Sequence, residues 1–221
     1  MSNVVAIDGP SGSGKSTVAR GVAGELGLEM LDTGAMYRAV TLVVLGRGTD
    51  PSDDAACAAI AKEVSLDVGQ RVLADGRDVT EAIRGPAVTN AVSLVAEHPA
   101  VREHLVSLQR SWVAERGGGV VEGRDIGTVV FPDAIVKIFL TASDRERARR
   151  RQLDEAAAKR EVDVDAVREA IDRRDRLDST REVSPLVAAP DAVTIDTTGS
   201  TADEIINEIV HRFRAATGAS A

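Results

Sequence analysis

The sequence predicts an α/β fold, in which helices cover both faces of a parallel β-sheet. Short apolar runs typical of buried strands alternate with stretches of helical apolar spacing, and this alternation is the pattern of such folds. The chain has 221 residues, of which 43% are apolar and 28% charged, as in globular rather than disordered proteins. Only 2% are aromatic, so Val, Leu, Ile and Ala must form the core.

Each expected strand is a short apolar run that ends at a turn or a polar residue. The first run stops at Asp8, directly before a glycine-rich turn. The strands are expected at 3–8, 30–32, 120–122, 134–140 and 192–196. A later stretch differs, because its apolar residues lie among turn signals at Gly69 and Gly76, which predicts short antiparallel strands. We therefore expect a small β-rich insert at about 64–85.

The expected helices are marked by apolar spacing, by proline near the first turn or by capping signals. Two S/T-x-x-E capping boxes begin at Ser143 and Thr201, where they open an arginine-rich helix and the last helix. Pro86 and Pro99 lie near the first turns of two others. The remaining helices are expected at 15–26, 35–45, 53–63, 87–96, 99–116 and 165–178.

The charge balance and hydropathy restrict the class of protein. With 27 basic and 35 acidic residues, the formal net charge is −8, which argues against a protein that coats nucleic acid or anionic membranes. No apolar stretch approaches the ~20 residues that span a bilayer, and the first residues do not form a signal peptide. We therefore expect a cytoplasmic monomer that has neither nucleic acid nor a membrane as a partner.

Cysteine and histidine offer little chemistry. The single cysteine, Cys57, excludes an internal disulfide and a multi-cysteine zinc site. It lies in an alanine-rich run, which favours a small core residue over the alternative of a reactive thiol. His98, His104 and His211 lie far apart without the spacing of metal ligands.

The segment after the first strand carries the most specific signal. It fits the pattern G-x-x-x-x-G-K-[ST] and lies between a strand and a helix, as a phosphate-binding P-loop requires. Its glycines let backbone N–H groups point at phosphate oxygens, and the helix that follows adds the positive end of its dipole. Lys15 would bridge the outer phosphates and the Ser16 hydroxyl would hold Mg²⁺. The predicted ATP-binding residues are Gly9, Pro10, Ser11, Gly12, Ser13, Gly14, Lys15, Ser16 and Thr17.

A P-loop does not by itself separate a kinase from a GTPase switch or a motor ATPase. None of the four lysines lies in the [NT]-K-x-D pattern that reads guanine, which weakens the GTPase interpretation. The other 23 of the 27 basic residues are arginine. A short chain rich in arginine favours a small-molecule kinase, in which the charges of two substrates are held together.

An arginine cluster follows the expected strand at 134–140. Its members are Arg145, Arg147, Arg149, Arg150 and Arg151. We expect a mobile lid at about 145–165 that closes over ATP and excludes water, with Arg149 and Arg150 as its candidate phosphate ligands. The alternative is an exposed helix with i,i+4 ion pairs, because residues 144–182 hold 12 basic and 12 acidic residues.

Taken in order, four passages make the chain resemble the bacterial-type cytidylate kinases, a branch of the P-loop nucleoside monophosphate kinases. The passages are Ile7–Lys15, Leu31–Arg38, Glu122–Ala134, and Arg173–Arg181 followed by Pro185-Leu186. The resemblance covers about residues 4–215. It implies a P-loop kinase fold in a single kinase domain over 1–221, with a monophosphate-binding lobe at about 33–105 that includes the β-rich insert, and an arginine-rich lid.

The resemblance also implies an acceptor site. Arg38, Arg124 and Arg181 match arginines that hold the monophosphate, and Arg174 and Asp178 match the pair around the sugar. Ser93, Arg102 and Asp125 match residues that read cytosine. Thr33 and Tyr37 match the site entrance. An aspartate suits cytosine, because its carboxylate accepts from the exocyclic amine and repels the O4 of uracil. Thr33 stands where serine is expected, and Leu177 where a basic residue is common.

The implied reaction moves the γ-phosphoryl group of ATP to CMP or dCMP, giving ADP and the diphosphate. Lys15, Arg124 and Arg181 would be the catalytic residues, and Glu122 would help Ser16 to hold Mg²⁺ through water. Two alternatives remain: another small P-loop kinase acting on UMP, AMP or a small alcohol, and a non-catalytic nucleotide-binding switch.

Overall fold

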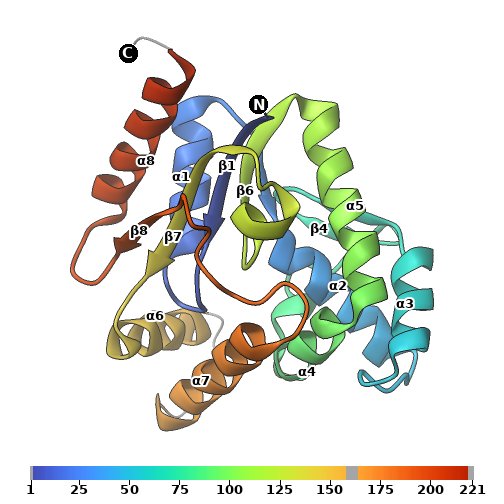
Figure 1. Ribbon diagram of the computed structural model, residues 1–221. Helices are drawn as coiled ribbons and strands as arrows, with labels where there is room; N and C mark the ends of the chain where they lie inside the picture. The colour runs from blue at the N-terminus through green and yellow to red at the C-terminus, as the bar shows by residue number, and fades with distance from the viewer. Residues whose placement is uncertain (1, 158–163, 219–221) are drawn as a thin grey trace. The chain divides into compact units, whose positions relative to one another are not determined.

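The computed structural model describes residues 2–157 and 164–218 (Figure 1). The chain divides into two compact units. The first comprises Met1–Met30, Gly117–Thr180 and Ser184–Ala221, and the second comprises Leu31–Arg116 and Arg181–Val183. Among the described residues, no helix combines the length and the apolar character needed to cross a membrane.

The first unit is built around parallel strands. Its helices and strands are β1 (Ser2–Asp8), α1 (Lys15–Leu26), β6 (Gly118–Gly123), η2 (Ile126–Val130), β7 (Ala134–Thr141), α6 (Asp144–Ala157), α7 (Val164–Thr180), β8 (Val193–Asp196) and α8 (Ala202–Thr217). With β2 (Met30–Asp32), the strands form a five-stranded sheet in the order β2-β6-β1-β7-β8. This parallel sheet flanked by helices confirms the predicted fold class.

Strand β1 lies in the middle of this sheet and determines where the chain can bind ligands. It pairs in parallel with β6 on one side and with β7 on the other. Asp8, its last residue, is in register with Gly123, the last residue of β6. The segments that follow these two strands therefore begin side by side, at the edge where α/β proteins place their ligands.

Aliphatic side chains from the sheet and from two helices form the core of this unit, as the low aromatic content predicts. Helix α1 packs against α8, and both helices contact the sheet (Figure 1). The core residues are Val5, Ile7, Val18, Ala19, Val22, Ala23, Val120, Val136, Ile138, Leu140, Ile205, Ile209 and Val210. Burial of this apolar surface holds β1, and hence the segment after it, in a defined position.

The second unit is mostly helical. Its elements are α2 (Thr33–Gly46), α3 (Asp54–Glu63), β3 (Leu66–Val68), β4 (Val72–Ala74), β5 (Arg77–Asp78), η1 (Ala82–Arg84), α4 (Pro86–Glu97) and α5 (Pro99–Arg116). Strands β3, β4 and β5 form an antiparallel sheet, which confirms the predicted β-rich insert. Cys57 is fully buried on α3, as expected of a core residue, and burial raises the pKa of its thiol.

Two local features differ from the sequence prediction. The π-helical turn η2 follows β6 where no helix was expected. At the start of α6 only half of the predicted capping box forms: the Ser143 Oγ accepts from the Glu146 N–H, but the Ser143 N–H donates to Thr198 Oγ1. The Glu146 carboxylate binds Arg149 and Arg150 instead. The predicted lid at 145–165 corresponds to α6 and the start of α7, and its residues 158–163 lie outside the described part of the chain.

Candidate active site

The segment Gly9–Gly14 forms a tight loop between β1 and α1, and Lys15–Thr17 lie in the first turn of α1. The loop backbone requires glycine, because φ is +147° at Gly9 and +77° at Gly12. A side chain at Gly9 would overlap the Leu140 carbonyl oxygen, and the Cβ of a residue at position 12 would lie 2.8 Å from the Arg147 carbonyl oxygen. The loop therefore folds closely against β7 and α6. Ser16 and Thr17 are exposed in the first turn of α1, where hydroxyl groups can meet a phosphate-bound ion.

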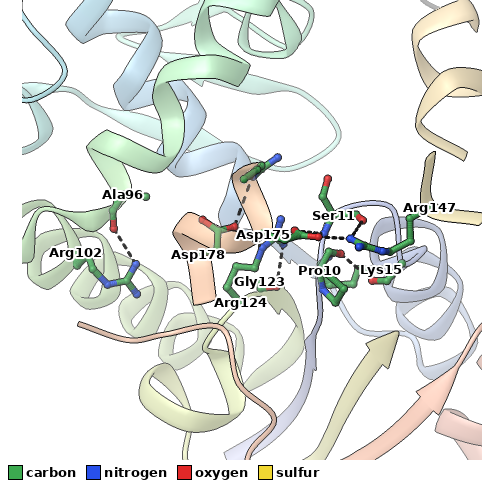
Figure 2. A network of polar contacts seen from close by, with 12 residues as sticks. Pro10, Ser11, Lys15, Ala96, Arg102, Gly123, Arg124, Arg147, Asp175 and Asp178 are labelled. Carbon is green, nitrogen blue, oxygen red and sulfur yellow. Dashed lines mark hydrogen bonds and ion pairs between the residues drawn. The ribbon is translucent and has the colours of Figure 1, made fainter. Parts of the chain in front are cut away.

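Lys15 begins α1 and turns back over the loop. Its Nζ donates to the Pro10 carbonyl oxygen at 2.7 Å (Figure 2). Burial, together with the positive charges of Arg124 and Arg174, lowers the pKa of Lys15 to about 7, against the opposing effect of Glu122 and Asp175. A buried ammonium among other cations is stabilised by an anion. This environment fits the phosphates of a nucleotide.

A second group of polar contacts links the loop to α6 and α7. The Asp175 carboxylate accepts from the Ser11 N–H at 3.1 Å and is paired with Arg147 (Figure 2). Arg147 also donates to the Ser11 carbonyl oxygen at 3.2 Å and to Asp144 at 2.8 Å. Only 8% of the Arg147 side chain is exposed. Arg147 and Asp175 thus contact the P-loop backbone directly.

The arginines of α6 occupy different environments. Arg149 is 60% exposed and pairs with Glu146 one turn away. Arg150 pairs with Glu146 and also donates to both the hydroxyl and the carbonyl oxygen of Thr197, at 2.8 Å each. The Thr197 hydroxyl in turn donates to the Ser13 carbonyl oxygen of the loop. Of the two α6 arginines that the sequence predicts as phosphate ligands, Arg150 is therefore the one that connects to the P-loop.

The segment after β6 carries Arg124 and Asp125. Arg124 donates through Nε to Asp178 of α7 at 2.9 Å (Figure 2), and Arg174 lies 3.9 Å from the same carboxylate. Burial by itself lowers the pKa of Arg124, but Asp178 and Asp175 outweigh it and raise the pKa above its usual value. The guanidinium therefore stays charged, as a phosphate ligand must.

Asp8 joins this segment to the P-loop. Its carboxylate accepts from the backbone N–H groups of Ile126 and Gly127, at 2.9 and 2.8 Å. Burial raises the pKa of Asp8 to about 6, although these two hydrogen bonds lower it. The structure thus brings Asp8, Lys15, Arg124 and Asp125 into one polar region at the ends of β1 and β6.

Other predicted acceptor residues belong to the second unit. Thr33 and Tyr37 are buried in the first turns of α2, and Ser93 is buried on α4. Arg38 donates to the Ile83 carbonyl oxygen and to the Thr89 hydroxyl. The remaining two are Arg102 and Arg181. Arg102 is 3% exposed, donates to the Ala96 carbonyl oxygen, and its guanidinium carbon lies 5.5 Å from the centre of the Tyr37 ring. Arg181 is partly buried just after α7.

The oxygen atoms available to a metal suit Mg²⁺. Ser16 offers a hydroxyl and the buried Glu122 a carboxylate, both hard oxygen donors. In the described part of the chain, no cluster of three or more His, Cys, Asp or Glu residues could hold a metal ion by itself. Mg²⁺ in kinases keeps several waters and takes most of its other ligands from substrate phosphates, so a sparse protein contribution fits.

Comparison with known proteins decides the family. The cytidylate kinase family model matches residues 5–215. The chain belongs to the cytidylate kinase family. It is 52% identical to a cytidylate kinase of Geobacillus kaustophilus over 93% of this chain and 94% of the relative. It is also 54% identical to a cytidylate kinase of Mycobacterium avium, over 93% of this chain and 92% of the relative.

Solved structures support the kinase fold independently of close sequence similarity. A gluconokinase from Sinorhizobium meliloti aligns with a TM-score of 0.50 over 98% of this chain and 95% of that chain, at 16% identity. An uncharacterized protein from Eubacterium ventriosum aligns with a TM-score of 0.58 over 97% of this chain and 99% of that chain, at 12% identity. At such identities the likeness shows the fold alone.

Sequence reasoning did not single out four residues that contact the P-loop or the segment after β6. They are Asp8, Arg147, Asp175 and Thr197. Asp8 could have been noticed as a charge at the end of a buried apolar run. Asp175 lies one turn before Asp178, inside the passage Arg173–Arg181 that carries part of the family resemblance. Nothing local distinguishes Arg147 from the arginines around it, because only its partners do so.

Proposed function

We propose that this protein transfers the γ-phosphoryl group of ATP to CMP or dCMP, giving ADP and CDP or dCDP, as a monomer in the cytoplasm. Its membership in the cytidylate kinase family supports the reaction. The observation that carries the proposal is the environment of Lys15, which is buried at the P-loop beside Arg124 and Arg174. Such a concentration of positive charge suits two phosphate-bearing substrates.

On this proposal, ATP binds with its phosphates against the P-loop, in contact with backbone N–H groups and the start of α1. Lys15 turns from the Pro10 carbonyl toward the β- and γ-phosphates. Ser16 would hold Mg²⁺ with help from Glu122 through water, and the ion, when bound, would supply positive charge against the outer phosphates. Arg149 and Arg150, on helix α6, complete the ATP site.

The acceptor is held by the remaining cations. Arg38, Arg124 and Arg181 hold its phosphate in line with the γ-phosphorus, and Arg174 with Asp178 contacts the sugar. Asp125, Ser93 and Arg102 read the cytosine, and Thr33 and Tyr37 form the entrance. An oxygen of the acceptor phosphate attacks the γ-phosphorus, and the bond from that phosphorus to the bridging oxygen of ADP breaks. The acceptor is mostly a dianion at neutral pH, so no general base is required.

An ADP-release assay with ATP and Mg²⁺ tests this function directly. The acceptors are CMP, dCMP, UMP, AMP, GMP and shikimate, each at the same concentration. We expect strong turnover with CMP and dCMP and little with the others. Preferred turnover of another acceptor would favour a different small P-loop kinase, and ATP binding without acceptor-dependent turnover would favour a nucleotide-binding switch.

A variant extends the test to the base-reading residue. An Asp125→Ala enzyme should lose its preference for CMP over UMP, because the carboxylate that accepts from the cytosine amine is gone. Retention of that preference would contradict the role of Asp125 while leaving the reaction itself intact.

A further inference from the structure

We propose that Asp8 is a positioning residue for acceptor recognition, which holds the segment after β6 so that Arg124 and Asp125 meet the acceptor. The residue has two connections. Its main chain leads directly into the P-loop, whereas its side chain binds the segment that carries Arg124 and Asp125. This inference rests on the acceptor-binding roles proposed above for those two residues.

Both carboxylate oxygens of Asp8 accept hydrogen bonds from this segment. Asp8 is 4% exposed at the end of β1, in register with Gly123 of β6. One carboxylate oxygen accepts the Ile126 N–H at 2.9 Å, and the other accepts the Gly127 N–H at 2.8 Å. Two hydrogen bonds from consecutive N–H groups restrict both the position and the orientation of the backbone that precedes them.

The turn η2 needs an acceptor from elsewhere. The Asp125 carbonyl oxygen accepts the N–H groups of Val129 and Val130, so the first N–H groups of the turn have no carbonyl partner within it. An aspartate in the N-cap position commonly caps such groups with its own side chain. Asp125 occupies that position but makes no such bond. Asp8, and not the side chain of Asp125, therefore caps the turn.

Lys137 contacts the same segment and binds its far end. A Cβ at Gly127 would lie 3.3 Å from Lys137 Cδ, closer than an ordinary contact, and 3.5 Å from an Asp8 oxygen, so the turn packs directly against both side chains. Lys137, on β7, donates to the Pro132 carbonyl oxygen at 2.5 Å and pairs with Asp191 at 2.8 Å. The segment from Ile126 to Pro132 is therefore anchored at its start by Asp8 and at its end by Lys137.

Stability alone does not account for a carboxylate at position 8. Burial and the nearby Asp125 raise the pKa of Asp8 from 3.8 to about 6, against the hydrogen bonds and the charge of Lys15, which lower it. Because the pKa of Asp8 is raised in the folded protein, its protonated carboxyl group stabilises the fold fully below pH 3.8. This contribution to the free energy of unfolding is lost as the pH rises through about 6. At neutral pH the ionised group therefore lowers stability relative to a neutral side chain of the same shape.

The test uses Asp8→Asn, which keeps the shape and one acceptor but turns an amide NH₂ toward the second N–H group. We expect KM for CMP to rise about ten-fold, and the ratio of kcat/KM for CMP to that for UMP to fall about ten-fold, the effect of losing one charge-assisted hydrogen bond. KM for ATP should change less than about three-fold, because the P-loop backbone is unchanged. At pH 7.5 we expect the Tm to change little, because removal of a buried charge opposes the loss of one hydrogen bond to a buried N–H group. The amide hydrogens of Ile126 and Gly127 should exchange faster.

Asp53→Ala is the matched control. Asp53 is also an aspartate whose side chain accepts a backbone N–H, that of Ala56 at 3.0 Å, but it caps α3 and has no proposed role in binding. This variant should lower the Tm without changing KM for CMP or the ratio of CMP to UMP. Gly127→Ala is a second test that keeps every carboxylate. Its Cβ would lie 3.3 Å from Lys137 Cδ, which requires a shift of a few tenths of an ångström, and would be in ordinary contact with Asp8, so the same ratio should fall by a smaller factor.

The outcomes separate this inference from the proposed function. If wild type prefers CMP and Asp125→Ala loses that preference, the proposed function stands. An Asp8→Asn enzyme with wild-type KM for CMP and a wild-type ratio would then overturn the role of Asp8 alone. A lowered Tm and kcat with an unchanged ratio would make Asp8 purely structural and would also overturn its proposed role in acceptor recognition.

If Asp8→Asn does not fold, an unchanged ratio of CMP to UMP in Gly127→Ala decides against the inference. Wild type without a CMP preference would refute the proposed function before any Asp8 variant is measured, and the inference with it.

Discussion

The P-loop and the segment after β6 follow neighbouring parallel strands, but they are held in different ways. The P-loop combines contacts of its own with remote ones. Lys15 Nζ and Ser13 Oγ both donate to the Pro10 carbonyl oxygen, at 2.7 and 3.0 Å. Arg147, Asp175 and Thr197 bind its backbone from distant parts of the sequence. The segment after β6 depends on side chains that are distant in sequence. Asp8 binds its turn from 118 and 119 residues away, and Asp178 binds Arg124 from 54 residues away.

This difference predicts different responses to mutation. A loop that is held in part by its own residues should lose function most when a residue that contacts ATP is changed, with little effect on acceptor specificity. A segment that is held from a distance should lose acceptor specificity when its remote partners change, even though those partners do not contact the base. The following experiments test that contrast, from the largest expected effect to the smallest.

Removal of the Lys15 ammonium should have the largest effect. Lys15→Ala should lower kcat by about a thousand-fold, because a preorganised positive charge at the transferred phosphoryl group is lost. The fold should remain, since no apolar core residue changes and a buried charge is removed. Steady-state kinetics and circular dichroism measure both properties. A variant that keeps more than about a tenth of the wild-type kcat would contradict the role of Lys15 at the phosphates.

Loss of the Asp178 carboxylate should affect the acceptor site through Arg124. Asp178→Ala should lower kcat/KM for CMP by about ten- to a hundred-fold and change the ratio of CMP to dCMP, because a buried guanidinium loses its partner beside the proposed sugar site. Asp178→Asn, which retains a hydrogen-bond acceptor, is the matched variant and should lose less. Equal losses on CMP and dCMP would show that Asp178 positions Arg124 without reading the sugar.

The pH dependence of ATP binding should report the environment of Lys15. With its pKa lowered to about 7, Lys15 is mostly neutral above that pH in the free protein. Bound phosphates favour the charged form, so ATP binding at pH 8 should take up a proton, and affinity should fall by up to about ten-fold per pH unit above 7.

Calorimetry in two buffers of different ionisation enthalpy measures this proton uptake. The control is Lys15→Arg, which stays charged throughout this range and should show no uptake linked to position 15. Uptake that is equal in wild type and Lys15→Arg would contradict the assignment to Lys15.

The smallest effect is expected at Arg149. Its side chain is exposed and pairs with Glu146, so Arg149→Ala should shift the Tm by no more than about 2 °C. Arg150→Ala should lower the Tm further and raise KM for ATP more, because Arg150 connects through Thr197 to Ser13 of the P-loop. A larger effect on KM for ATP from Arg149 would reverse this order and would indicate that Arg149 becomes a phosphate ligand when ATP is bound.

Much of the fold could be predicted from local sequence. The pattern of apolar runs placed β1, β2, β7, β8 and the main helices within a few residues of their observed bounds. The capping box at Thr201 formed as predicted, since both of its hydrogen bonds lie within one turn. The box at Ser143 formed only in part, because Thr198, which is distant in sequence, provides an acceptor for the Ser143 N–H.

The sequence by itself determined the features that depend on neighbouring residues: the alternation of strands and helices, the P-loop with its required glycines, and the family through its four motifs. Tertiary structure alone decided which charged groups that are distant in sequence meet. It selected Arg147 and Arg150 over Arg149 as contacts toward the P-loop, and it brought Asp8 to the turn that follows Asp125. The physical reason is that local patterns reflect backbone geometry and apolar spacing. The partner of a buried charge depends instead on how the strands are ordered in the sheet, and here that order places the ends of β1 and β6 side by side.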